Sequence, residues 1–162
     1  TGNNRTSKGG AAYFNSKSGL ALNVAGLHDL YTLLSVTNAK SERDEVVDIG
    51  GMGDKILVHP PQLRDEAFQT LESEYLPGVD HNDKNPWYKT CKPVEWRYLS
   101  DNSTTFYLGI AKKGITFYRR GKAEIRMFRN EDTGGYRATI RARYGWMAWN
   151  YRFWTAGNPP TA

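Results

Sequence analysis

The sequence predicts an α+β fold, with a mostly antiparallel sheet and two or three flanking helices. In the first half of the chain, apolar residues recur at helical spacing around one short apolar run. After Trp87 the period changes to two, which is typical of strands with one buried face. The chain of 162 residues is long enough to bury a core as one medium domain or two small lobes. We therefore expect helices mainly before Trp87 and sheet after it.

The first half is predicted to contain a helix, a buried strand and a second helix. Asn23 is a plausible N-cap for an amphipathic helix that ends near Val36. The continuous apolar run at residues 55–58 indicates a buried strand. Two prolines at 60 and 61 end this strand and start a helix, because proline is tolerated in a first helical turn. The helical pattern continues until Pro77.

The second half is predicted to contain four short strands and one long one. Apolar alternation marks the short strands at residues 94–98, 106–110, 115–117 and 123–127. Turns are expected between them at 100–103, 112–114 and 120–122. The long strand, 135–155, follows a hairpin turn at 130–135 whose glycines supply positive φ. These strands make a meander.

The long strand separates apolar and cationic side chains onto opposite faces. Tyr136, Ile140 and Tyr144 share one face, because alternate residues of a strand point the same way. The opposite face carries three arginines: Arg137, Arg141 and Arg143. We expect one dry face and one face that meets water or a partner.

Residues 146–154 hold three of the five tryptophans: Trp146, Trp149 and Trp154. Aromatic rings are large apolar groups that favour cores and interfaces. Two interpretations stay open for them: packing in the core of this chain, or burial in a subunit interface.

The positive charge is concentrated in one region. The chain has a net charge of +5, whereas residues 112–152 alone carry eleven basic and three acidic side chains, or +8. Such a region is attracted to phosphates or to an acidic patch on a neighbour. A solvated sheet face is the other interpretation.

No sequence motif points to catalysis. The sequence contains no P-loop, no dinucleotide-binding fingerprint, no zinc-protease helix motif and no nucleophile elbow. Cys91 has no second cysteine to pair with. Asp80, His81 and Asp83 could supply metal ligands, but their spacing matches neither an EF-hand nor a zinc-site pattern. We expect no catalytic residue, cofactor or metal. No apolar run is long enough to cross a bilayer, so we expect a soluble protein.

Several runs of the sequence resemble the tailed-phage major capsid proteins of the HK97 fold. A short helix at 22–31 is followed by a turn and then by residues 53–63, which hold the strand and the double proline. A second helix comes after them. The basic, sheet-rich end of the chain looks like the rest of such a subunit: residues 94–99, 123–128 and 136–145. The resemblance spans residues 20–158. It identifies the chain as the C-terminal portion of a larger coat protein or as a reduced relative.

The resemblance implies a division of the chain. Residues 55–128 would belong mainly to an axial domain at capsomer centres. Two further segments would belong to a peripheral domain: 20–54 and 129–162. Residues 1–19 are rich in Gly, Ser, Asn and Lys and show no period, so we expect a flexible arm or loop there.

The resemblance also implies a function. The chain would be a structural subunit of an icosahedral bacteriophage shell, in which pentamers and hexamers enclose double-stranded DNA, with other capsid or scaffold proteins as further partners. It would reside in the virion, and in the host cytoplasm during assembly. Candidate residues for subunit or DNA contacts are Arg126, Arg137, Arg141, Arg143, Trp149, Arg152 and Trp154. The alternative function is a nucleic-acid-binding module that uses the basic sheet at 112–152.

Overall fold

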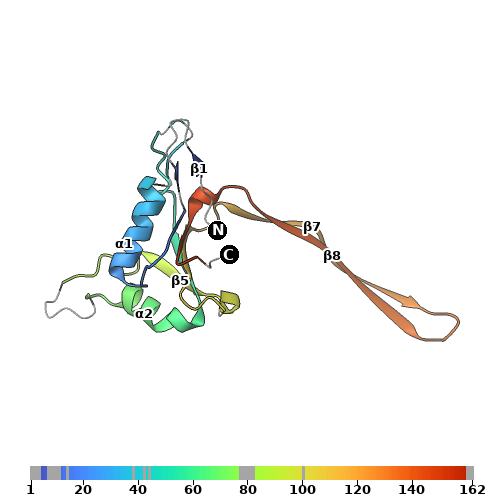
Figure 1. The fold of residues 1–162 in the computed structure, drawn as a ribbon. Helices are drawn as coiled ribbons and strands as arrows, with labels where there is room; N and C mark the ends of the chain where they lie inside the picture. Colours follow the sequence, from blue (N-terminus) through green and yellow to red (C-terminus); the bar gives the residue numbers. More distant parts are fainter. Residues whose placement is uncertain are drawn as a thin grey trace. The chain divides into compact units, whose positions relative to one another are not determined.

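A computed structural model shows a chain of two compact units. It describes residues 5–6, 12–13, 15–37, 39–41, 43, 45–76, 83–99 and 101–159. The first unit, here called the sheet unit, comprises Thr1–Gly114 and Asn150–Ala162. The second, here called the hairpin unit, comprises Ile115–Trp149. The expected α+β class is confirmed, with helices and a mixed sheet in the sheet unit and a long antiparallel pair in the hairpin unit (Figure 1).

The first predicted helix is confirmed. Helix α1 spans Val24–Thr32 and continues as a π-helical turn, η1, over Leu33–Thr37. Asn23 is its N-cap, since its side-chain oxygen accepts a hydrogen bond of 2.8 Å from the Gly26 amide.

The predicted strand and second helix are also confirmed, although the helix is shorter than expected. Strand β4 spans Lys55–His59, the 3₁₀ turn η2 Pro61–Leu63, and helix α2 Arg64–Glu72. The helix ends five residues before Pro77 because another group satisfies its last carbonyls. The Asn85 amide donates to the carbonyls of Thr70 and Ser73, at 2.6 and 3.0 Å.

The sheet unit is built on five strands in the order β3-β9-β6-β4-β5. Besides β4, these are β3 (Ser16–Lys17), β5 (Cys91–Glu95), β6 (Phe106–Ile110) and β9 (Trp154–Gly157). The pairs β4–β6 and β6–β9 are antiparallel, whereas β3–β9 and β4–β5 are parallel. The expected meander is wrong, because β5 pairs with β4 rather than with β6 and, among the described strands, β7 pairs only with β8. A separate short pair joins β1 (Arg5–Thr6) to β2 (Ala12–Tyr13). The rest of the expected arm, residues 1–4, 7–11 and 14, lies outside the described part of the chain.

Both helices cover one face of this sheet. Leu57 of β4 lies opposite Leu108 of β6, and both side chains are fully buried. They share a core cluster with Leu30 of α1 and with Leu71 of α2. Full burial of one such side chain contributes about 1.5–3 kcal/mol, so this cluster is the main source of stability in the sheet unit.

The expected strand at residues 94–98 is wrong in its second half. Strand β5 ends at Glu95, and residues Arg97–Leu99 form the 3₁₀ turn η3. Leu99 is buried beneath this turn, whereas Tyr98 remains 87% exposed. Burial of Leu99 therefore decides the local conformation against the alternating pattern.

The two strands expected at 115–117 and 123–127 are one strand. Strand β7 spans Ile115–Arg129 and pairs with β8, Tyr136–Ala148, along its whole length (Figure 1). The expected turn at 120–122 is wrong. The pairing register shifts on both sides of Gly121, as at a β-bulge, which interrupts the alternation without ending the strand.

The turn between β7 and β8 is confirmed, although only one of its two glycines has a positive φ. Gly134 has φ +64°, whereas Gly135 does not have a positive φ. The Asn130 backbone amide donates a hydrogen bond to the Gly135 carbonyl at 2.7 Å. The long strand ends at Ala148 rather than at 155. Asn150 caps the 3₁₀ turn η4, Tyr151–Phe153, and the chain then enters β9. The final tryptophan-rich segment is thus shared between two units.

Candidate subunit interface on the hairpin

The hairpin unit exposes a row of large apolar side chains on one face. Directly paired residues lie on the same face of an antiparallel ladder, and the pairs here include Phe117 with Trp146 and Ile125 with Ile140. We call this side the apolar face. Its large side chains are Ile115, Phe117, Ile125, Met127, Tyr136, Ile140, Tyr144 and Trp146.

The expectation that this face is dry within the chain is wrong. Exposure ranges from 50% at Ile115 to 81% at Tyr136. An exposed apolar surface of this kind marks an interaction site. Covering one such side chain fully would contribute about 1.5–3 kcal/mol to an association. The apolar alternation of the sequence is thus real, but the described residues of this chain leave this face exposed.

Two arginines lie among these apolar side chains. Arg119 pairs with Tyr144, and Arg129 pairs with Tyr136, so both belong to the apolar face. The rings of Phe117 and Tyr144 stack with centroids 5.9 Å apart. The face therefore combines aromatic surface with positive charge, a composition that is enriched at protein interfaces.

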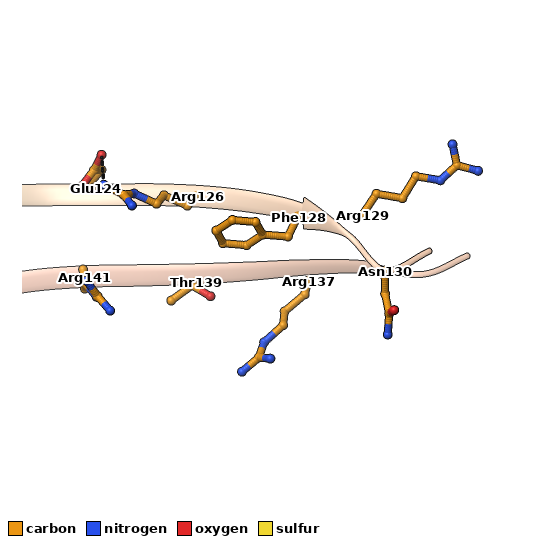
Figure 2. Close-up of a pocket in the computed structure, with 8 residues that line it drawn as sticks. All are labelled: Glu124, Arg126, Phe128, Arg129, Asn130, Arg137, Thr139 and Arg141. Atoms are coloured by element: carbon orange, nitrogen blue, oxygen red, sulfur yellow. Dashed lines mark hydrogen bonds and ion pairs between the residues drawn. The ribbon is translucent and has the colours of Figure 1, made fainter. Parts of the chain in front are cut away.

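The opposite side of the hairpin carries four of the candidate arginines, and we call it the basic face. They are Arg126, Arg137, Arg141 and Arg143. Arg126 forms an ion pair with Glu124 at 3.2 Å, which Figure 2 shows as dashed lines. Arg126, Arg137 and Arg141 line an open hollow of about 550 Å³, together with Glu124, Phe128, Arg129, Asn130 and Thr139. Among the described residues, Arg137, Arg141 and Arg143 form no ion pair, so this face has charge available for an anionic partner.

The hairpin unit carries the net charge of the protein. It contains eight arginine and lysine side chains against three acidic ones, or +5, which equals the +5 of the whole chain. The sheet unit is therefore formally neutral. The net positive charge thus lies in the unit with the exposed apolar face.

The other candidate residues lie at or beyond the base of the hairpin. Trp149 is 56% exposed. Arg152 lies in η4, half-buried, and its Nε atom has no hydrogen-bond partner among the described residues. Trp154 lies in β9, where its indole nitrogen donates to the Lys113 carbonyl at 3.0 Å and its ring lies against Gly109. Of the three tryptophans near the C-terminus, Trp154 is thus built into the sheet.

Groups that could support catalysis or metal binding are sparse in the described chain. Its His, Cys, Asp and Glu side chains form no cluster of three that could hold a metal, while Asp80 and His81 lie outside the described residues. Burial raises the pKa of the Cys91 thiol from its ordinary value of 9.0 to about 11, against the weaker opposing effect of Lys55. A thiol of this kind stays protonated near neutral pH and is a poor nucleophile.

Comparison with protein families identifies the class of protein. Residues 1–156 match a family described as phage capsid protein. The chain therefore belongs to this family, and its role is structural, in the oligomeric shell of a bacteriophage virion. A comparison with curated protein sequences finds no significant match. No helix in the described part of the chain has the length and apolar character needed to span a bilayer.

The sequence predicts the arginines of the basic face but not the full extent of the apolar face. The pairing of β7 with β8 adds Phe117, Ile125 and Met127 to the face that Ile140 and Tyr144 begin. The sequence carries a signal for these residues, because they alternate with polar ones. It predicts separate short strands, however, because the bulge at Gly121 resembles a turn.

Proposed function

We propose that this chain is a self-assembling subunit of an icosahedral bacteriophage capsid of the HK97 fold. The observation that carries the proposal is the exposed apolar face of the hairpin in a member of a phage capsid family. In a shell, many modest contacts are repeated by symmetry, so one such face per subunit supplies many interfaces. Pentamers and hexamers would be the intermediate assemblies, formed in the host cytoplasm, with other capsid or scaffold proteins as further partners.

The HK97 assignment rests on the order of elements. Helix α1, strand β4, the double proline and helix α2 follow each other in the order that the resemblance to the HK97 fold implies. We assign residues 55–128 mainly to an axial domain, and residues 20–54 and 129–162 to a peripheral domain. The hairpin unit draws on both segments, since all of β7 except Arg129 falls in the first and β8 falls in the second.

The basic face is proposed to contact the packaged double-stranded DNA. Arginine side chains bind phosphates by charge and by paired N–H donors, and Arg137 and Arg141 line the same open hollow. The measurement is the amount of nuclease-protected DNA per particle. Replacing both arginines with alanine is expected to lower it, whereas Thr139→Ala, on the same face, is expected to leave it unchanged. Equal protection in all three proteins would contradict a DNA contact.

Assembly is tested by expressing the full chain and recording native masses and negative-stain images. Pentamers, hexamers or closed shells are the expected result. A chain that remains monomeric at every concentration tested would contradict the proposed function. Salt-dependent binding of DNA by such a monomer would instead favour the nucleic-acid-binding module.

A further inference from the structure

We infer that the apolar face of the hairpin docks onto helix α2 of a second copy of this chain. The inference rests on the proposed assembly of copies and names the two surfaces that meet. It follows from the distribution of charge between the two units.

The charge of the hairpin unit argues against pairing of two hairpins. Each hairpin unit carries +5, and like charges brought together across an apolar contact repel strongly because little water screens them. Arg119 and Arg129 lie on the apolar face itself. A symmetric contact between two apolar faces would bring four arginines into one interface. The partner surface must therefore be acidic.

The outer surface of α2 has the required charge. Residues 65–74 contain four carboxylates and no lysine or arginine. Asp65, Glu66 and Glu72 are exposed on the helix. The nearest basic residue in sequence, Arg64, lies 3.9 Å from Glu95 and is thus directed toward an acid of its own chain.

The same surface of α2 also carries an apolar anchor. Phe68 is 65% exposed, although Ala67, Thr70 and Leu71 on the other side of the helix are buried. Asp65 precedes Phe68 by three residues and Glu72 follows it by four, so all three lie on one stripe of the helix. An aromatic ring between two carboxylates complements a face on which aliphatic side chains lie between two arginines.

A contact from hairpin to helix is heterologous, because each copy uses one surface to bind a different surface of the next. Such contacts generate closed rings when the rotation between copies closes. This is the kind of contact that pentamers and hexamers require. The basic face remains uncovered in this arrangement and is available for DNA.

Cross-linking of two chains tests the contact directly. One population carries Phe68→Cys and the other, labelled with ¹⁵N, carries Ile140→Cys. The wild-type chain, whose Cys91 is buried, is the control. After mild oxidation, mass spectrometry is expected to show a disulfide between position 68 of an unlabelled chain and position 140 of a labelled one. Particles that assemble with links between two copies of position 140, or with no link to position 68, would overturn the inference.

Charge reversal supplies a second test. Asp65→Lys with Glu72→Lys is expected to lower particle yield about tenfold, as is Arg119→Glu with Arg129→Glu, and all four changes together are expected to restore it. The matched control is Arg137→Glu with Arg141→Glu on the basic face, which changes the net charge by the same amount as Arg119→Glu with Arg129→Glu. Adding Asp65→Lys with Glu72→Lys to this control should not raise its particle yield. If wild type assembles and both reversed variants give the same particle yield as wild type, the docking is overturned and the proposed function stays intact. A wild-type chain that never assembles would contradict both.

Discussion

The sheet unit and the hairpin unit use the same amphipathic pattern for opposite purposes. In the sheet unit, Phe106, Leu108 and Ile110 alternate along β6 and are fully buried beneath the helices. In the hairpin unit, Ile125 and Ile140 form a direct cross-strand pair and are 62% and 68% exposed. The first pattern stabilises a fold, whereas the second leaves an apolar surface exposed, which we propose is a subunit interface.

The largest difference is expected between an aliphatic residue of the core and one of the hairpin. Leu108→Ala should lower the free energy of unfolding by about 2–5 kcal/mol, since it leaves a cavity in a packed core. Ile140→Ala should change it by less than about 0.5 kcal/mol, because the side chain is exposed. Urea unfolding of the unassembled chain measures both. Equal losses would mean that Ile140 is covered within the monomer.

Two glycines sharpen the same comparison. A Cβ at Gly109 would lie 2.3 Å from the Trp154 ring, whereas one at Gly121 would have no atom within 4 Å. Gly109→Ala should therefore lower stability by about 1–3 kcal/mol, through displacement of the indole. Gly121→Ala should have little effect on the unfolding midpoint. A neutral Gly109→Ala would show that Trp154 does not pack on β6.

The tryptophans near the C-terminus offer a third contrast. Trp154→Ala removes a ring that packs on Gly109 and a hydrogen bond to Lys113, with an expected loss of about 1–3 kcal/mol in unfolding free energy. Trp149→Ala should cost less than about 1 kcal/mol, because Trp149 is more than half exposed. Thermal melting in parallel distinguishes them. The reverse order would place Trp149 in the core.

The smallest effect concerns the buried thiol. Because burial raises the pKa of Cys91 to about 11 from an ordinary value of 9.0, the unfolded chain loses this proton first as pH rises. Stability is therefore present below pH 9 and declines between pH 9 and 11. Cys91→Ala should flatten that part of the pH–stability curve. At pH 8, a thiol reagent should label native wild type far more slowly than the denatured chain, and equal rates would contradict the burial.

Much of the sheet unit could be predicted because local signals and tertiary packing agree there. Asn23 caps its helix, and the prolines after His59 start the next one. The hairpin was predicted less well. At Gly121 a bulge and a turn have the same sequence signature, and only the pairing partner distinguishes them.

The candidate site shows the same limit. The arginines of the basic face could be found from alternation alone. Whether Tyr136 and Trp146 are covered by the same chain depends on tertiary contacts that no period encodes. An amphipathic strand specifies a face to be buried but not the molecule that buries it.

We propose that the apolar face of the hairpin is a subunit interface. This is tested by the native mass of the full chain beside that of a variant with Ile125→Asp and Ile140→Asp. We expect assembled rings or shells for wild type, and a folded monomer with an unchanged unfolding midpoint for the variant. Assembly of the variant with wild-type mass and yield would contradict the proposal.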